Sequence, residues 1–324
     1  SIMKTNKTAH IIGSLCRSLL GITFIFSGFV KAVDPLGTVY KIEDYLMAFG
    51  GWFTDLMPLA GTAAVALIAL EWTLGVCMLF NVRTSITAWL SLAFYLVMTP
   101  LTLWIALTNP VSDCGCFGDA IVLTNWQTFW KNVVLLILVI MLLGCKKYIP
   151  QLLSWWGELV VLLLALGASA TIMAYSYTHL PPMDFRPYKV GNHIPTLMEV
   201  PDGAPVDEYA ITLIYEKDGI EQEFTLENYP KGDSTWTFVD QQSVLIKKGY
   251  EPPIHDFEIL TMNFEDITYD ILEFEEPITL ITMYDLNKTN RTQAAKLTGI
   301  YHACMERGEQ CYFLTGSGEE QIYA

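Results

Sequence analysis

The chain has 324 residues, enough for two domains, and 52% of them are hydrophobic while only 16% are charged. This composition excludes an ordinary soluble protein, in which about a quarter of the residues are charged. The net charge of −15 lies in the second half, because residues 178–324 hold 26 acidic and 10 basic residues, whereas residues 1–177 hold 8 and 9. So acidic a surface repels phosphate backbones, which excludes nucleic acid as a partner.

Five apolar stretches approach the roughly 20 residues that a helix needs to cross a bilayer. Each is expected to be helical, because lipid offers no hydrogen bonds to the backbone. The first stretch is long, contains Arg17 and lacks a small-residue exit site, so we interpret it as a span and not as a cleavable signal peptide. The predicted spans are residues 10–30, 59–80, 84–107, 126–144 and 152–175.

The short loops between the spans differ in charge, and this predicts an orientation. Positive charge collects before the first span, between spans two and three, and between spans four and five, at Lys4, Lys7, Arg83, Lys146 and Lys147. These ends should be cytoplasmic. The other loops are mainly acidic, so the loop after span three and the region after span five are predicted to lie outside.

The second half begins with an extended, proline-containing spacer at residues 180–187 and then changes to a strand pattern. Residues 211–215 and 223–226 predict a hairpin about the turn at residues 217–219. The end of the chain predicts a strand, a helix and a parallel strand, at residues 278–284, 290–306 and 311–315. Further short strands are predicted at residues 236–239, 244–247 and 257–262.

The strongest chemical feature is Cys114-Gly115-Cys116, in the loop after span three. Two thiols separated by one glycine can close a small ring, because glycine tolerates the backbone angles that the ring requires. A strained disulfide is more oxidising and exchanges more readily, and so short a ring gains little stability. The pattern therefore favours a redox pair. A fixed loop staple, or a reduced pair held by packing, fits the same residues.

Other residues form weaker candidates. Glu71 lies midway through span two, where an ionisable group is costly unless paired, and Arg17 is its predicted partner in a proton-transfer site or a structural ion pair. Cys304 and Cys311 are predicted to form a structural disulfide. Cys16 and Cys77 lie at similar depths, which allows a thiol relay, although buried apolar packing fits them better. The histidines show no metal-ligand spacing, so no metal is expected.

The segment Asp113–Gly118, followed by Leu123–Trp126, resembles the DoxX/MauE-like family of bacterial membrane proteins. Residues 27–31 with Asp34-Pro35, and Glu71, are also similar to that family. The resemblance covers roughly residues 10–146 and implies a four-helix membrane bundle. Its MauE branch is associated with disulfide chemistry during maturation of a periplasmic enzyme. Some members carry a further span and a thioredoxin-like domain, and residues 278–315 look like the start of that fold.

We therefore expect an all-α membrane domain, a four-helix DoxX/MauE-like bundle plus a fifth transmembrane helix, followed by a soluble α+β domain ending in a partial thioredoxin-like β-α-β unit. The predicted boundaries are residues 1–150, 151–178 and 179–324. Residues 287–290 carry Asn-Lys-Thr-Asn where a redox-active thioredoxin has two cysteines, so no thioredoxin chemistry is expected there.

Two functions fit this sequence. The preferred one is an inner-membrane thiol–disulfide exchange protein whose Cys114–Cys116 pair faces the periplasm, with a quinone or another thiol protein resetting it. The alternative is a non-enzymatic membrane anchor, or a subunit of a cell-envelope complex, whose acidic domain binds partners. In either case the expected partners are envelope proteins and membrane lipid.

Overall fold

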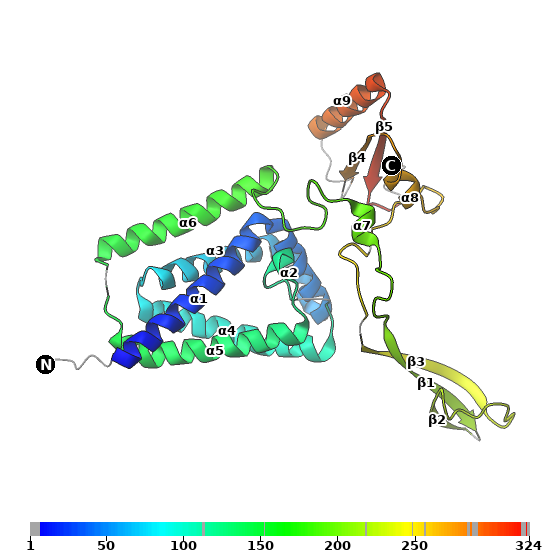
Figure 1. Ribbon diagram of the computed structural model, residues 1–324, viewed down its shortest axis with the longest axis horizontal. Coiled ribbons are helices and arrows are strands. Elements are labelled where there is room, and N and C mark those ends of the chain that lie inside the picture. The colour runs from blue at the N-terminus through cyan, green and yellow to red at the C-terminus, as the bar shows by residue number, and fades with distance from the viewer. Residues whose placement is uncertain are drawn as a thin grey trace. The chain divides into compact units, whose positions relative to one another are not determined.

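The computed structural model of the chain describes residues 7–111, 114–151, 153–217, 219–247, 249–255, 257–283, 286, 291–318 and 322. The chain divides into two compact units, residues 1–189 and residues 190–324 (Figure 1). The first unit is helical and contains all the helices that, among the described residues, are long and apolar enough to span a membrane. The second contains the strands.

Five helices in the described residues have the length and composition of membrane spans, which confirms the predicted spans. The prediction missed two shorter elements between the first two spans, the helix α2 (Pro35–Phe49) and the 3₁₀ helix η1 (Gly51–Leu59). The five long helices are α1 (Lys7–Val33), α3 (Ala60–Leu79), α4 (Thr84–Thr108), α5 (Asn125–Cys145) and α6 (Trp155–Thr178).

Glycines bring α1 and α3 unusually close together. A Cβ atom added to Gly28 would lie 2.7 Å from the backbone nitrogen of Trp72, and one added to Gly75 would lie 2.6 Å from that of Ile25. Small residues let membrane helices approach to backbone contact, where van der Waals packing is strongest. This contact fixes the register of the two antiparallel helices and sets residue 27 of α1 opposite residue 71 of α3.

Replacing Gly75 by alanine is expected to destabilise the protein by about 1–3 kcal/mol, the usual cost of overpacking a tight contact. The added methyl group would meet backbone atoms, which cannot rotate away. Gly61, in the first turn of α3, has open space at the same position, so Gly61→Ala is the matched control and should not destabilise. Thermal unfolding in detergent measures both. Equal transition temperatures for the two variants would contradict the packing account.

The core of the membrane unit lies where α1, α3, α4 and α5 meet. Leu20, Phe24 and Tyr95 are buried there against Val139 and Leu142 of α5. The rings of Phe24 and Phe94 pack edge to face at 5.3 Å, a favoured aromatic geometry. Large apolar side chains on the outer helix faces, such as Trp89 and Val97, are exposed in the structure, as expected of helices that face lipid.

Helix α6 is tied to the bundle by a polar contact that sequence reasoning missed. Glu158, in its first turn, is buried and accepts a hydrogen bond of 2.9 Å from Nε of Arg83, in the turn between α3 and α4. Gln151 donates to the same carboxylate. These contacts fix the start of α6 beside the α3–α4 turn.

The described part of the second unit contains two separate sheets. The strands β1 (Glu208–Lys217), β2 (Ile220–Thr225) and β3 (Thr237–Lys247) form an antiparallel sheet in the order β2-β1-β3, which confirms the hairpin. The strands β4 (Ile278–Met283) and β5 (Gln310–Thr315) pair in parallel, with α9 (Arg291–Arg307) between them in the chain. The predicted β-α-β unit is therefore confirmed, whereas its likeness to thioredoxin stays a prediction.

Of the further strand predictions, two are confirmed in position and one is wrong. Residues 237–239 and 244–247 are strand, but they belong to one continuous strand, β3, whose pairing with β1 includes register shifts that sequence periodicity does not reveal. The segment 257–262 forms only an isolated bridge from Leu260 to Asp266, because Thr261 turns the chain through a backbone bond with Glu265. The unit also has two short helices, α7 (Ile194–Met198) and α8 (Thr268–Leu272). Residues 287–290 lie outside the described residues.

Candidate active site

The loop that carries the two neighbouring cysteines is fastened at both ends. At its start, Asn109 ends α4 in a left-handed conformation with φ of 46°, and its side chain accepts a 3.1 Å hydrogen bond from Asn125. At its end, Thr124 caps α5 through a capping box with Gln127, which satisfies exposed N–H groups of the first turn. These residues therefore fix where α4 ends and where α5 begins, and so fix both ends of the loop between them.

Within this loop the sulfur atoms of Cys114 and Cys116 lie 2.7 Å apart, and both residues are thiols in the structure. The glycine between them allows this approach, because Gly115 has a φ of +63°. A Cβ atom at that position would also lie 2.9 Å from Cγ of Lys41. The backbone thus holds the two sulfurs within a small movement of the roughly 2.05 Å bond of a disulfide.

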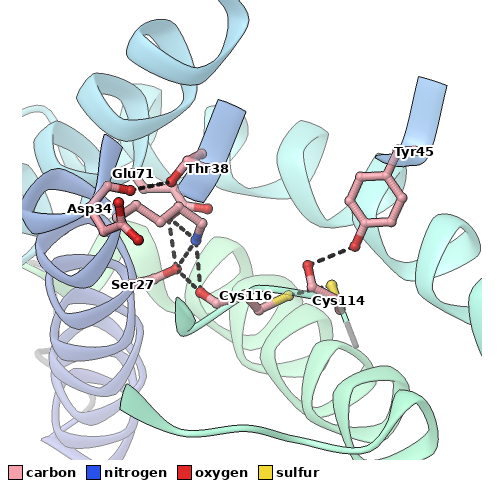
Figure 2. A network of polar contacts seen from close by, with 8 residues as sticks. Ser27, Asp34, Thr38, Tyr45, Glu71, Cys114 and Cys116 are labelled. Atoms are coloured by element: carbon pink, nitrogen blue, oxygen red, sulfur yellow. Dashed lines mark hydrogen bonds and ion pairs between the residues drawn. The ribbon is translucent and has the colours of Figure 1, made fainter. Parts of the chain in front are cut away.

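Hydrogen bonds hold the backbone carbonyls of both cysteines. Tyr45 of α2 donates a 2.6 Å bond to the carbonyl oxygen of Cys114. On the other side of the pair, Nζ of Lys31 donates a 2.7 Å bond to the carbonyl oxygen of Cys116, and Oγ of Ser27 lies at the same distance from it (Figure 2). The main chain of the pair is therefore held from two helices, α1 and α2.

Glu71 is buried beside these contacts, as the sequence predicted, but its predicted partner was wrong. Its Oε2 atom accepts from Nζ of Lys31 at 2.9 Å and lies 2.7 Å from Oγ of Ser27. Arg17 instead donates to the carbonyl oxygens of Met78 and Leu79 at the end of α3. Met78 is seven residues from Glu71, which is about 10 Å along the helix. In the α1–α3 register Arg17 therefore lies near the end of α3, whereas Lys31 lies beside Glu71 and pairs with it.

Lys131 of α5 is a second cation next to the pair, and sequence reasoning did not single it out. Its Nζ atom lies 4.2 Å from the centre of the Phe117 ring, which orients the side chain by a cation–π contact. Glu71, Cys116 and Lys131 line the same small cavity of about 20 Å³, which also touches Ser27 and Asn132. A cavity of that volume with several polar walls is large enough for one water molecule.

These neighbours separate the acidities of the two thiols. The hydrogen bond from Cys114, helped by the positive charges of Lys131 and Lys31, lowers the pKa of the Cys116 thiol to about 6, although burial and Glu71 oppose this. The same bond, together with burial and the neighbouring Cys116 charge, raises the pKa of Cys114 well above its usual range. These shifts make Cys116 the more acidic thiol of the pair.

A larger cavity of about 160 Å³ lies against the same loop. The segment that leaves α6 contributes Pro181 and Asp184–Arg186 to its wall, and the cysteine loop contributes Gly115 and Gly118. Asp184 and Arg186 form a charged pair at 2.7 Å, and its hydrogen bond lowers the pKa of Asp184. The spacer predicted at residues 180–187 therefore starts by packing beside the candidate site.

The other predicted cysteine pairs are less well supported. Cys304 and Cys311 are close enough for their thiols to share a hydrogen bond, but both are thiols in the structure, so their disulfide stays a prediction. Cys16 lies within electrostatic range of Cys145 on α5, and Cys77 lies within range of Glu158 on α6. The relay between Cys16 and Cys77 also stays a prediction.

The sequence contained a usable signal for some of the site residues that the prediction missed, and none for others. Lys31 follows the first apolar span and Glu71 lies within the second. Because few basic residues are near these spans, Lys31 was one of few groups that could neutralise the buried Glu71 carboxylate. Ser27 lies one turn before Lys31. Tyr45 carried no signal, because α2 was interpreted as a loop. Lys131, in the first part of an otherwise apolar span, was visible as an isolated charge.

Comparisons with known proteins agree with the membrane architecture. Residues 9–145 match the family model described as methylamine utilisation protein MauE, and residues 209–248 match a family described only as a domain of unknown function. No curated protein and no solved structure gives a match. Residues 9–145, about two-fifths of the chain, are thus similar to MauE, and together with the five spanning helices this supports a MauE-like membrane protein. The wider likeness to DoxX proteins stays a prediction.

Proposed function

We propose that this MauE-like membrane protein is a thiol–disulfide exchange protein, acting through Cys114 and Cys116 at the periplasmic face of a bacterial inner membrane. One observation carries the proposal: the two sulfurs lie 2.7 Å apart on a loop whose main-chain carbonyls are held by Tyr45 and Lys31. A pair that served only as a staple would need no adjacent cations and no difference in acidity between its two thiols.

The charges around Cys116 support a thiolate there. Lys31 and Lys131 contribute two positive charges and Glu71 one negative charge. A Cys116 thiolate brings the sum of these four groups to zero, whereas a neutral thiol would leave one positive charge unbalanced. Buried charges are costly unless they are paired, so this arrangement favours the thiolate, which is the nucleophile in disulfide exchange.

The proposed reaction has two steps. The Cys116 thiolate attacks a sulfur of a partner's disulfide, the partner's S–S bond breaks, and one partner thiolate leaves. Cys114 then loses its proton and attacks the Cys116 sulfur, which releases the second partner thiol and forms the Cys114–Cys116 disulfide. Two electrons pass from the pair to the partner, and the reverse sequence oxidises a partner dithiol. A second thiol protein or a quinone is the proposed reagent that resets the pair.

The pH dependence of Cys116 alkylation tests this assignment. In the reduced protein the rate should rise as the pH passes through about 6, where the thiolate forms, and then level off. Lys131→Met removes a cation that favours the thiolate, so its profile should move to higher pH, whereas Lys7→Met, far from the loop, should not move it. Peptide mapping after iodoacetamide treatment measures both. An ordinary thiol profile near pH 8.5 in every variant would contradict the assignment.

A binding role for the acidic second unit accompanies this proposal. Strand β2 is an edge of its sheet and exposes Glu221 and Glu223. An exposed edge can pair with an extended peptide, and acidic side chains favour a basic one. The unit would hold an envelope protein while the membrane unit does the chemistry. If Cys114 and Cys116 prove unreactive, this binding role becomes the non-enzymatic anchor function. Crosslinking of the full chain that weakens with added salt would support it.

A further inference from the structure

A second polar hollow lies where α4 begins and α5 ends, in the same membrane unit. It has a volume of about 420 Å³ and is lined by the start of α4, the end of α5 and the chain that follows. Arg83, Lys146 and Lys147 supply positive charge, and Ser85 and Gln151 supply polar groups. The cysteine loop joins the other ends of α4 and α5, so this hollow does not belong to the candidate active site.

The hollow carries an excess of positive charge. The guanidinium of Arg83 is neutralised by Glu158, but none of the described residues that line the hollow is acidic. Nζ of Lys146 donates a 3.1 Å hydrogen bond to Oγ of Ser85, which leaves the serine hydroxyl proton to be donated onward. Lys147 is exposed at the edge. Lys146, Lys147 and Ser85 thus give the wall of the hollow two ammonium groups and a hydroxyl donor.

Aromatic side chains place this hollow at the depth of lipid headgroups. Nζ of Lys146 lies 5.4 Å from the centre of the Trp89 ring, and Nζ of Lys147 lies 4.9 Å from that of Tyr148. Trp155 and Trp156, at the start of α6, are exposed. Tryptophan and tyrosine gather at membrane–water interfaces, where the ring contacts lipid and its polar group contacts water.

We propose that this hollow binds the phosphate group of an anionic phospholipid. The two ammonium groups match a phosphate that carries a net negative charge, and Ser85 provides a neutral donor beside them. A zwitterionic lipid carries its own ammonium group and gains less from two lysines. Basic pockets beside the ends of membrane helices suit such headgroups, each basic residue adding a comparable share of the affinity.

The test is a titration of the purified full chain in detergent with phosphatidylglycerol, followed by native mass spectrometry. Lys146→Gln with Lys147→Gln should weaken phosphatidylglycerol binding roughly thirtyfold, about fivefold for each lysine. Lys7→Gln removes a lysine of α1 that does not line the hollow and should leave the affinity unchanged. Phosphatidylcholine should bind weakly to all three proteins.

A second arm, thermal unfolding with inorganic phosphate, separates a lipid from a soluble ligand. Stabilisation by phosphatidylglycerol alone, lost in the double variant, supports the lipid site. Stabilisation by inorganic phosphate alone, also lost in that variant, would overturn the lipid and leave a soluble-phosphate site. Equal binding of phosphatidylglycerol by the double variant and the unmodified protein would overturn the proposal. Cys114 and Cys116 take no part in these measurements, so their outcome is separate from the exchange reaction.

Discussion

Replacing Lys31 by methionine is expected to destabilise the protein by about 3–5 kcal/mol, the usual cost of removing one partner from a buried ion pair. Lys31 and Glu71 are both buried, so the variant would strand a carboxylate away from water. The change also removes one of the two groups that contact the Cys116 carbonyl, the other being Ser27, which should loosen the cysteine loop. Denaturant unfolding in detergent measures the loss of stability, and the alkylation rate of Cys114 reports loosening of the loop.

Two further variants separate the ion pair from a general effect of substitution. Lys31→Met with Glu71→Leu removes both charges, so it should recover much of the stability, because no unpaired charge remains. Lys7→Met, on an exposed site of the same helix, should change stability by less than about 0.5 kcal/mol. If Lys31→Met alone were as stable as the Lys7 control, the ion pair would not hold this part of the fold.

Replacing Cys116 by serine is expected to reduce disulfide exchange to background, because the nucleophile is lost. Replacing Cys114 by serine should have a different effect. Cys116 could still attack a partner's disulfide, but no second thiol would release the product, so a mixed disulfide should accumulate. The assay incubates the purified protein with a small aromatic disulfide and follows both the released thiol and the mass of the protein.

The control for these variants is Cys145→Ser, at the end of α5 and remote from the loop. It should exchange at the unmodified rate. Comparable activity in Cys116→Ser would show that another thiol reacts, and would contradict the assignment of Cys116 as nucleophile. Failure of Cys114→Ser to trap an adduct would contradict the resolving role of Cys114.

The spanning helices could be predicted from the sequence because each needs a long apolar run, and hydropathy reports that directly. Helix α2 could not, because its mixture of apolar and charged residues around Lys41, Glu43 and Asp44 resembles a polar loop. Hydropathy shows which segments enter the membrane but does not reveal a short helix that packs beside them. That omission also hid Tyr45, the residue that holds the Cys114 carbonyl.

The partner of Glu71 depended on helix register, which hydropathy does not contain. Arg17 lies within the predicted first span and Lys31 directly follows it, and either was chemically suitable. The close contacts at Gly28 and Gly75 set the register between α1 and α3. In this register Ser27 and Lys31 lie opposite Glu71. The Cys-Gly-Cys motif could be recognised in the sequence. The contacts of Tyr45 and Lys31 with its main chain could not, because they come from helices that are distant in the sequence.

The redox state of Cys114 and Cys116 in intact cells tests the central claim most directly. Cells are treated with a mass-tagged maleimide, with and without prior reductant, and the tags on the peptide that carries the pair are counted. An exchange protein should show a mixture of reduced and oxidised pairs, and the mixture should shift when respiration is blocked. A pair locked in one state under every condition would contradict the claim that it exchanges.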